Sequence, residues 1–243
     1  MSALSQTWSL LTRASHPRRA FLVMAGLAGA AAVSGREARE VGVVAAAVLV
    51  GQAVLGWHND LVDVARDRAA LDADELASKP LAAGDVRPAN AWFAMACAVL
   101  LLIPLSLTSG VVAGGWYLGS VAVGLLGNLV LRRSWLSFLP WAVAFAAYPA
   151  FLSYGGWGGS PPAGDIGPPR PVLVALSALL GVCVHVLGAL PDLVQDNRVG
   201  YRHLPLRVGL RTGATRLLVL TGIATTAVVT GLVAAAFAGG LRS

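Results

Sequence analysis

Residues 58–68 read His-Asn-Asp-Leu-Val-Asp-Val-Ala-Arg-Asp-Arg and directly follow an apolar segment. Within this stretch Asn59, Asp63 and Asp67 stand four residues apart, so a helix would place them on one face, one turn after another. Asp60 adds a third carboxylate, about 100° around the helix from Asn59. Carboxylate and amide oxygens without a thiol or imidazole cluster are suitable ligands for a hard cation such as Mg²⁺. The stretch therefore predicts a cation site where a membrane helix meets water.

A second acidic cluster lies downstream, where residues 191–200 read Pro-Asp-Leu-Val-Gln-Asp-Asn-Arg-Val-Gly. Asp192 and Asp196 repeat the four-residue spacing, again at the end of an apolar segment. A single cluster has a plain alternative interpretation as the solvated face of a soluble helix. Because the pattern occurs twice, we interpret it as a pair of metal-binding motifs. The candidate metal ligands are Asn59, Asp60, Asp63, Asp67, Asp192 and Asp196.

The composition indicates a membrane protein. Of the 243 residues, 56% are hydrophobic and 12% are charged, whereas soluble domains usually carry about 25% charged residues. Apolar segments at seven places predict about seven transmembrane helices, over residues 21–35, 41–57, 89–107, 111–131, 135–154, 172–190 and 217–237. The Gly- and Pro-rich residues 155–171 are expected to form an irregular loop. Cys97 and Cys183 lie inside apolar segments and are interpreted as packing residues.

The distribution of charge predicts the orientation in the membrane. The formal net charge is +6. With seven spans and a cytoplasmic amino terminus, fourteen of the 18 Lys and Arg residues fall on the cytoplasmic side and four on the outer side, as the positive-inside rule requires. The excess of Lys and Arg residues is thus explained by the orientation of the chain in the lipid bilayer, and no nucleic-acid partner is expected. The same orientation puts both aspartate clusters on the cytoplasmic side of the cell membrane.

The two clusters together resemble the motifs of the UbiA superfamily of intramembrane prenyltransferases. The family's N-D-x-x-D-x-x-x-D motif matches Asn59, Asp60, Asp63 and Asp67, and its D-x-x-x-D motif matches Asp192 and Asp196. Residues 79–84, Lys-Pro-Leu-Ala-Ala-Gly, are similar to the basic-Pro-x-x-x-Gly segment after the first motif, and residues 200–209 are similar to the tail of the second. The resemblance covers roughly residues 16–238.

The resemblance implies a fold, namely an all-α bundle of membrane helices around a central cavity, formed by residues 1–243 as one domain. The family usually has nine membrane helices. Two interpretations stay open: either the last two helices are lacking here, or the predicted spans merge or omit helices.

The resemblance also implies an activity. It implies Mg²⁺-dependent transfer of a prenyl group from a polyprenyl diphosphate to an aromatic or other lipophilic acceptor. The catalytic residues would then be Asp63, Asp67, Asp192 and Asp196, which would hold Mg²⁺ against the leaving diphosphate. Candidate substrate-binding residues are polar or basic groups near the clusters or inside the spans, namely Asn59, Arg68, Lys79, Asn128, Arg132, His185, Arg198 and Arg202. Arg68, Lys79, Arg198 and Arg202 each have an alternative interpretation as a topology charge or interfacial anchor.

Polar side chains inside membrane spans are costly and often mark function. Gln52, Asn128 and His185 are such residues. His185 is interpreted either as a general base or acceptor-binding group, or as a polar contact between helices. Asn128-x-x-x-Arg132 occupies the place where many family members have Tyr-x-x-x-Lys. Aromatic candidates for contact with a carbocation, each with packing as the alternative, are Trp57, Trp116, Trp141 and Tyr148.

Other functions were weighed against transfer to an acceptor. A terpene cyclase of the UbiA type would quench the cation within its own prenyl chain and use no acceptor. A transporter or ion-binding protein would carry its acidic residues near the bilayer midplane, with repeat symmetry, whereas here they follow the spans. A purely structural subunit would not need two metal-binding motifs. The sequence leaves open the length of the donor, the identity of the acceptor and the oligomeric state.

Overall fold

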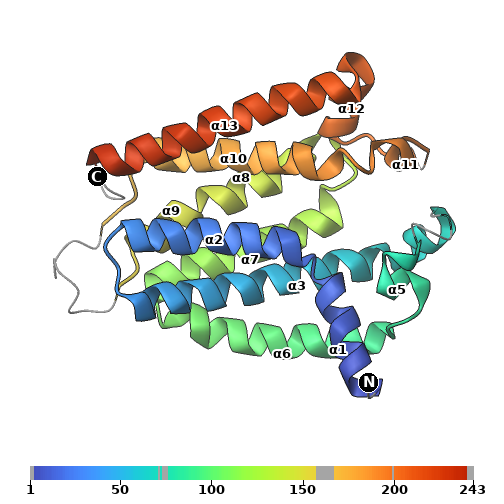
Figure 1. The fold of residues 1–243 in the computed structure, drawn as a ribbon, viewed down its shortest axis with the longest axis horizontal. Helices are drawn as coiled ribbons and strands as arrows, with labels where there is room; N and C mark the ends of the chain where they lie inside the picture. The colour runs from blue at the N-terminus through green and yellow to red at the C-terminus, as the bar shows by residue number, and fades with distance from the viewer. Residues whose placement is uncertain (1–2, 71, 73–75, 157–166, 199, 240–243) are drawn as a thin grey trace. The chain divides into compact units, whose positions relative to one another are not determined.

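The computed structural model describes residues 3–70, 72, 76–156, 167–198 and 200–239 (Figure 1). Its elements are α1 (Ala3–Ala14), α2 (Pro17–Val33), α3 (Ala38–Ala70), α5 (Pro80–Ala83), α6 (Pro88–Leu107), α7 (Val111–Val130), the 3₁₀ helix η1 (Trp135–Phe138), α8 (Leu139–Ala146), α9 (Tyr148–Ser153), α10 (Pro171–Ala189), α11 (Leu193–Arg198), α12 (Leu204–Thr212) and α13 (Ala214–Gly239). The predicted all-α fold is confirmed.

The membrane spans agree closely with the apolar segments. Among the described residues, six stretches are long and apolar enough to cross a membrane: α3, α6, α7, the run from η1 to α9, α10 and α13. The remaining predicted span, residues 21–35, corresponds to α2, which has 17 residues. The chain is therefore an integral membrane protein of about seven apolar helices. Of the predicted loop at 155–171, residues 157–166 lie outside the described part of the chain.

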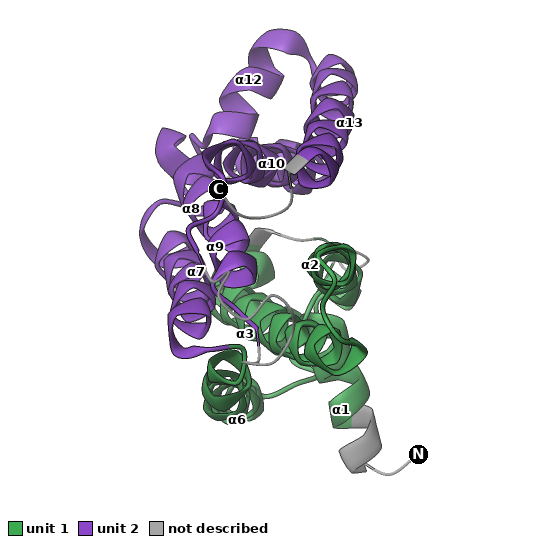
Figure 2. Ribbon diagram, turned by 90° about the vertical axis from the view of Figure 1, so that its left-hand side faces the viewer, with its two compact units in different colours: residues 1–109 green, residues 110–243 purple. Residues whose placement is uncertain are grey.

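The chain divides into two compact units, residues 1–109 and residues 110–243 (Figure 2). The expectation of a single domain over residues 1–243 stays a prediction. In unit 1 (residues 1–109) the central element is α3, which packs against α2 and against α6. With 33 residues, α3 is about 50 Å long, and the hydrocarbon core of a bilayer is about 30 Å thick. One end of α3 therefore extends beyond the apolar layer.

The corner between α1 and α2 is held against α3. Gly56 permits the close approach, because a Cβ at this position would lie 2.7 Å from the backbone oxygen of Ser15. One residue further along, the Trp57 indole Nε1 donates a hydrogen bond of 2.8 Å to the Leu11 carbonyl. His16 forms the corner with a φ of 53°, a left-handed conformation that is uncommon for a residue with a side chain. The corner therefore rests on specific contacts with α3.

A small apolar core supports the same end of unit 1. Its buried members come from α1, α5, α6 and the segment between α5 and α6, namely Leu11, Ala14, Leu81, Val86, Ala91 and Ala94. Trp57 packs against this core. A cation–π role for Trp57 stays a prediction, since the structure shows packing and the hydrogen bond to Leu11.

In unit 2 (residues 110–243) the helices pack in the order α7, α8, α10 and α13, each against the next. Glycines lie at two of these contacts. A Cβ on Gly127 of α7 would overlap the Pro140 ring, and a Cβ on Gly181 of α10 would overlap the Trp141 backbone of α8. Small residues allow membrane helices to approach closely in this way. The approach at Gly181 brings α8 against α10, which carries His185.

The fifth span is broken. It consists of η1, α8 and α9, and Pro149 lies at the start of α9. Because proline has no backbone N–H, the helical hydrogen bond from residue 149 to the Phe145 carbonyl is missing. This span is 61% buried inside the protein, compared with 17% for α13. The interruption thus lies in a largely buried span, as expected for irregular backbone at membrane depth.

Candidate functional site

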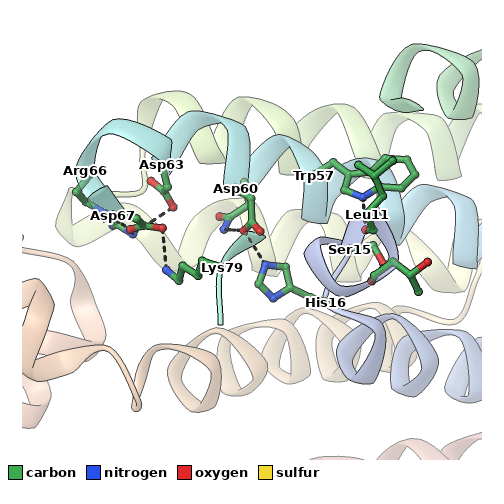
Figure 3. Close-up of polar contacts among 11 residues, drawn as sticks. Leu11, Ser15, His16, Trp57, Asp60, Asp63, Arg66, Asp67 and Lys79 are labelled. Atoms are coloured by element: carbon green, nitrogen blue, oxygen red, sulfur yellow. Dashed lines mark hydrogen bonds and ion pairs between the residues drawn. The ribbon is translucent and has the colours of Figure 1, made fainter. Parts of the chain in front are cut away.

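The first acidic cluster lies on α3, as the four-residue spacing predicted. Asp60, Asp63 and Asp67 are buried, at 7%, 3% and 2% relative exposure, and Asn59 is partly buried. Figure 3 shows these carboxylates along the helix with their polar partners. A buried carboxylate is costly unless it is paired or hydrogen-bonded. The partners of each carboxylate therefore determine what the cluster can do.

Asp67 is compensated by two cationic side chains (Figure 3). Arg66 reaches Oδ1 through Nη2 at 2.7 Å and through Nε at 3.0 Å, and Lys79 Nζ lies 2.8 Å from Oδ2. Arg66 Nη2 also lies 3.2 Å from Asp63 Oδ2. Lys79, a candidate substrate-binding residue, thus contacts the first motif directly, and its binding of substrate stays a prediction. Arg66 was not singled out, although its position three residues after Asp63 is a recognisable pattern for an ion pair.

Asp60 is held from the corner between α1 and α2. His16 Nε2 lies 2.8 Å from Asp60 Oδ1, and the Asn59 side-chain amide donates a longer hydrogen bond, 3.5 Å, to the same oxygen. His16 is 44 residues away in sequence, and no sequence pattern connects it with the motif. Its position follows from the contact between Gly56 and Ser15.

Arg68 makes a different kind of contact from Lys79. Its Nε donates to the Ala82 carbonyl at 2.9 Å and its Nη2 to the Leu81 carbonyl at 3.4 Å. These hydrogen bonds attach α5 to α3, which is a structural role. Binding of substrate by Arg68 stays a prediction.

The second acidic cluster lies in unit 2 on a separate short helix. α10 ends at Ala189, two residues before Pro191, and the residue before a proline is disfavoured in a helix. Asp192 is exposed in the turn that follows, whereas Asp196 is buried on α11. The Asp196 N–H donates a 2.8 Å hydrogen bond to the Asp192 carbonyl. The two residues are therefore one helical turn apart, as predicted, but differ in exposure.

Asp196 is paired with a histidine that was not singled out from the sequence. His203 Nε2 lies 2.8 Å from Asp196 Oδ2, and both residues are buried. The Arg198 and Arg202 side chains are exposed at either end of the segment between α11 and α12. The Arg202 backbone N–H donates to the Arg133 carbonyl at 3.3 Å. This hydrogen bond connects the second cluster with the turn after α7.

The polar residues predicted in or next to the spans of unit 2 lie on α7, on α10 and in the turn after α7. His185 Nε2 lies 2.9 Å from Ser137 Oγ, and its ring stacks on Trp141 with centroids 5.7 Å apart. This geometry supports the interpretation of His185 as a polar contact between helices. Asn128 is partly buried on α7, and Arg132 lies in the turn after that helix. Substrate binding by these three residues stays a prediction.

The remaining aromatic candidates have separate surroundings. Tyr148 is buried among aromatic rings, 5.0 Å from the centroid of Phe145 and 6.3 Å from that of Tyr117. Trp116 is 48% exposed. Packing accounts for Tyr148 in this structure.

The donor chemistry fits a hard cation. No group of three or more His, Cys, Asp or Glu side chains that could hold a metal is present among the described residues. Mg²⁺, however, is usually bound by one or two carboxylates together with water and substrate phosphates, rather than by a complete cage of side chains. In unit 1 the three carboxylates are buried, Arg66 and Lys79 contact Asp63 and Asp67, and His16 contacts Asp60. The carboxylates of this cluster outnumber the cationic side chains of Arg66 and Lys79, and their oxygen atoms are suitable ligands for a divalent cation.

Known proteins share this fold. The model of the UbiA prenyltransferase family matches residues 20–242. A solved UbiA homologue from Archaeoglobus fulgidus bound to GPP and Mg²⁺ is 18% identical, with a TM-score of 0.65, over 90% of this chain and 77% of that chain. A structure of a UbiA homologue from the same organism bound to DMAPP and Mg²⁺ is 16% identical, with a TM-score of 0.63, over 91% of this chain and 75% of that chain. Among curated proteins no match was found.

Proposed function

This chain belongs to the UbiA prenyltransferase family, and on that premise we propose that it is a Mg²⁺-dependent intramembrane prenyltransferase. It moves a prenyl group from a prenyl diphosphate to an aromatic or other lipophilic acceptor. The observation that carries the proposal is the row of buried carboxylates, Asp60, Asp63 and Asp67, on the end of an apolar helix long enough to span a membrane. The GPP, DMAPP and Mg²⁺ of the two solved homologues support the class of donor and the metal.

The two acidic clusters have the metal-binding role in this proposal. Asp63, Asp67, Asp192 and Asp196 are the catalytic ligands, and Asn59 and Asp60 complete the first motif. Bound Mg²⁺ neutralises charge on the diphosphate and so makes it a better leaving group. Without a cation the carboxylates would repel the diphosphate.

Cationic side chains next to the clusters bind the phosphate oxygens. Lys79 is the best-supported candidate for this role. Its Nζ lies 2.8 Å from Asp67, and a charged N–H donor forms strong hydrogen bonds to phosphate. Arg66 has the same position on the other oxygen of Asp67. The exposed Arg198 and Arg202 are candidates near the second motif. Arg68, Asn128, Arg132 and His185 remain the other proposed substrate-binding residues.

The active site faces the cytoplasm in this proposal, and the protein lies in the cytoplasmic membrane. Support comes from the fourteen Lys and Arg residues that fall on the side of the clusters, compared with four on the other side. A water-soluble diphosphate head group would arrive from this side.

A UbiA-type terpene cyclase is the second candidate. It is favoured by one observation, namely that Asn128 stands where many family members have a tyrosine. In a cyclase the same carboxylates would hold the metal during ionisation of the prenyl diphosphate, and the resulting carbocation would be quenched by the prenyl chain itself.

Release of diphosphate by the purified protein in detergent tests these proposals. Geranyl, farnesyl and geranylgeranyl diphosphate are supplied in turn with Mg²⁺, with and without a pool of aromatic lipids and quinone precursors. Release that requires an acceptor supports the transferase, and a cyclic product formed without an acceptor supports the cyclase. Asp63→Ala and Asp192→Ala are expected to abolish release. The exposed Asp85 provides the control variant, Asp85→Ala, which should release diphosphate normally. Full activity of both cluster variants would exclude the metal assignment.

A further inference from the structure

His203 uses both ring nitrogens, each for a different partner. Nδ1 accepts a 3.1 Å hydrogen bond from the Leu206 backbone N–H, and Nε2 lies 2.8 Å from Asp196 Oδ2. The first contact caps the amino-terminal end of α12. The second reaches the acidic cluster. His203 is buried at 4% relative exposure, so the arrangement is enclosed by protein.

These two contacts determine where the imidazole proton lies. A backbone N–H can only donate, so Nδ1 accepts and carries no proton. The neutral ring then has its proton on Nε2, which donates to the Asp196 carboxylate. The tautomer is assigned from this geometry. His203 is thus a neutral donor to Asp196, and this hydrogen bond orients the carboxylate without itself cancelling the charge.

The segment that carries His203 is itself anchored. The next residue, Leu204, donates its backbone N–H to Ser137 Oγ at 3.3 Å, and the same oxygen contacts His185 Nε2 at 2.9 Å. η1, α10 and the start of α12 therefore meet at this point within unit 2. An imidazole fixed from two sides gives the attached carboxylate a defined direction.

We propose that His203 is a positioning residue, which orients the Asp196 carboxylate for a divalent cation bound with a diphosphate. The inference rests on the proposed function, since it assigns Asp196 to metal binding. A carboxylate has about four lone-pair sites, and the N–H···O bond from His203 uses one of them. Hydrogen-bond partners behind metal ligands typically change metal affinity by about 10- to 100-fold when they are removed.

Two substitutions separate the two contacts of His203. Asparagine places its amide group as many bonds from Cα as Nδ1, so His203→Asn keeps a capping group and loses the reach to Asp196. Glutamine places its amide as far along the chain as Nε2, so His203→Gln keeps a donor for Asp196 and loses the cap. Both are compared with the wild-type full-length protein in detergent.

The readouts are binding of Mn²⁺, followed by electron paramagnetic resonance in the presence of inorganic diphosphate, and thermal unfolding without metal. Mn²⁺ accepts the same oxygen ligands as Mg²⁺. We expect His203→Asn to weaken Mn²⁺ binding about tenfold or more with little change in unfolding temperature. We expect His203→Gln to restore most of the affinity while unfolding roughly 2–4 °C lower, because the cap is lost.

Unchanged Mn²⁺ affinity in both variants would overturn the positioning role while leaving the proposed function in place. Equal losses of affinity and stability in both variants would also overturn it, because His203 would then only support the fold. If the wild-type protein itself bound no Mn²⁺ with diphosphate, the proposed function would fail and the inference with it.

Discussion

Asp67 in the first acidic cluster and Asp196 in the second are both buried, but they have different partners. In unit 1, Asp67 contacts two cationic side chains, Arg66 and Lys79. In unit 2, Asp196 contacts the imidazole of His203, which the hydrogen bond to its Nδ1 makes a neutral donor. Cationic partners cancel the charge of a carboxylate, whereas a neutral partner only directs it. The described contacts of Asp67 and Asp196 therefore differ in charge, although both residues belong to motifs with the same four-residue spacing.

The clusters also differ in how the backbone presents them. The first motif occupies successive turns of a continuous 33-residue helix. The second begins in the turn after α10 and continues on α11, a helix of six residues. Orientation in the first case comes from a rigid helix and in the second from side-chain contacts. Substitutions that affect one cluster and spare the other test this difference.

The largest effect is expected when one carboxylate in each cluster is made neutral. Asp67→Asn removes the carboxylate that Lys79 contacts and one of the two carboxylates that Arg66 contacts. In this largely buried site the cost is about 3 kcal/mol. Asp196→Asn keeps an oxygen that accepts from His203, so the loss is about 1 kcal/mol. Chemical or thermal unfolding in detergent, with both variants in parallel, gives the two values. Equal losses of unfolding free energy in the two variants would show that the two clusters do not differ through the charge of their partners.

An intermediate effect is expected at the close contact behind the first cluster. Gly56→Ala puts a methyl group 2.7 Å from the Ser15 oxygen and should destabilise the protein by about 1–3 kcal/mol. Gly42 lies on the same helix with no atom within 4 Å of an added Cβ, so Gly42→Ala should be neutral or slightly stabilising. The difference in unfolding free energy between these variants is the measurement. Equal stability would mean that the corner between α1 and α2 does not depend on this contact.

The smallest effect is expected at His16, the counterpart of His203 in unit 1. His16 has a side chain that is 39% exposed, and exposed ion pairs contribute at most about 1 kcal/mol. His16→Asn suits the left-handed backbone and removes only the contact with Asp60. Mn²⁺ affinity, measured as for His203, should fall by no more than about fivefold. A fall as large as that of His203→Asn would place both histidines in the same role.

Much of the fold was predictable because its determinants are local in sequence. Apolar runs predicted the spans, and the four-residue spacing placed the first motif on a helix, as α3 shows. The ion pair between Arg66 and Asp63 was also predictable from the sequence, since it depends only on helix geometry. Pro149 and Pro191 are local signals for the breaks in the fifth span and after α10. The broken span was nevertheless predicted as one segment.

The histidine partners were not predictable, because they depend on tertiary packing. His16 reaches Asp60 only because Gly56 lets the Ser15 backbone approach α3. His203 lies seven residues from Asp196, in a segment that was compared with the family motif as a whole. Its two hydrogen bonds depend on the path of the chain between α11 and α12. Neither path leaves a periodic pattern in the sequence.

The break at Pro149 has a consequence for how the chain is inserted into its membrane. A lipid-exposed helix with a missing backbone hydrogen bond is costly, so this span needs protein on its sides. Its neighbours in unit 2 are α7, which is synthesised before it, and α10, which is synthesised after it. We therefore expect the fifth span to reach a stable place in the bilayer only after α10 has been synthesised. On this account we expect concerted insertion of the helices of unit 2 rather than a series of independent insertions.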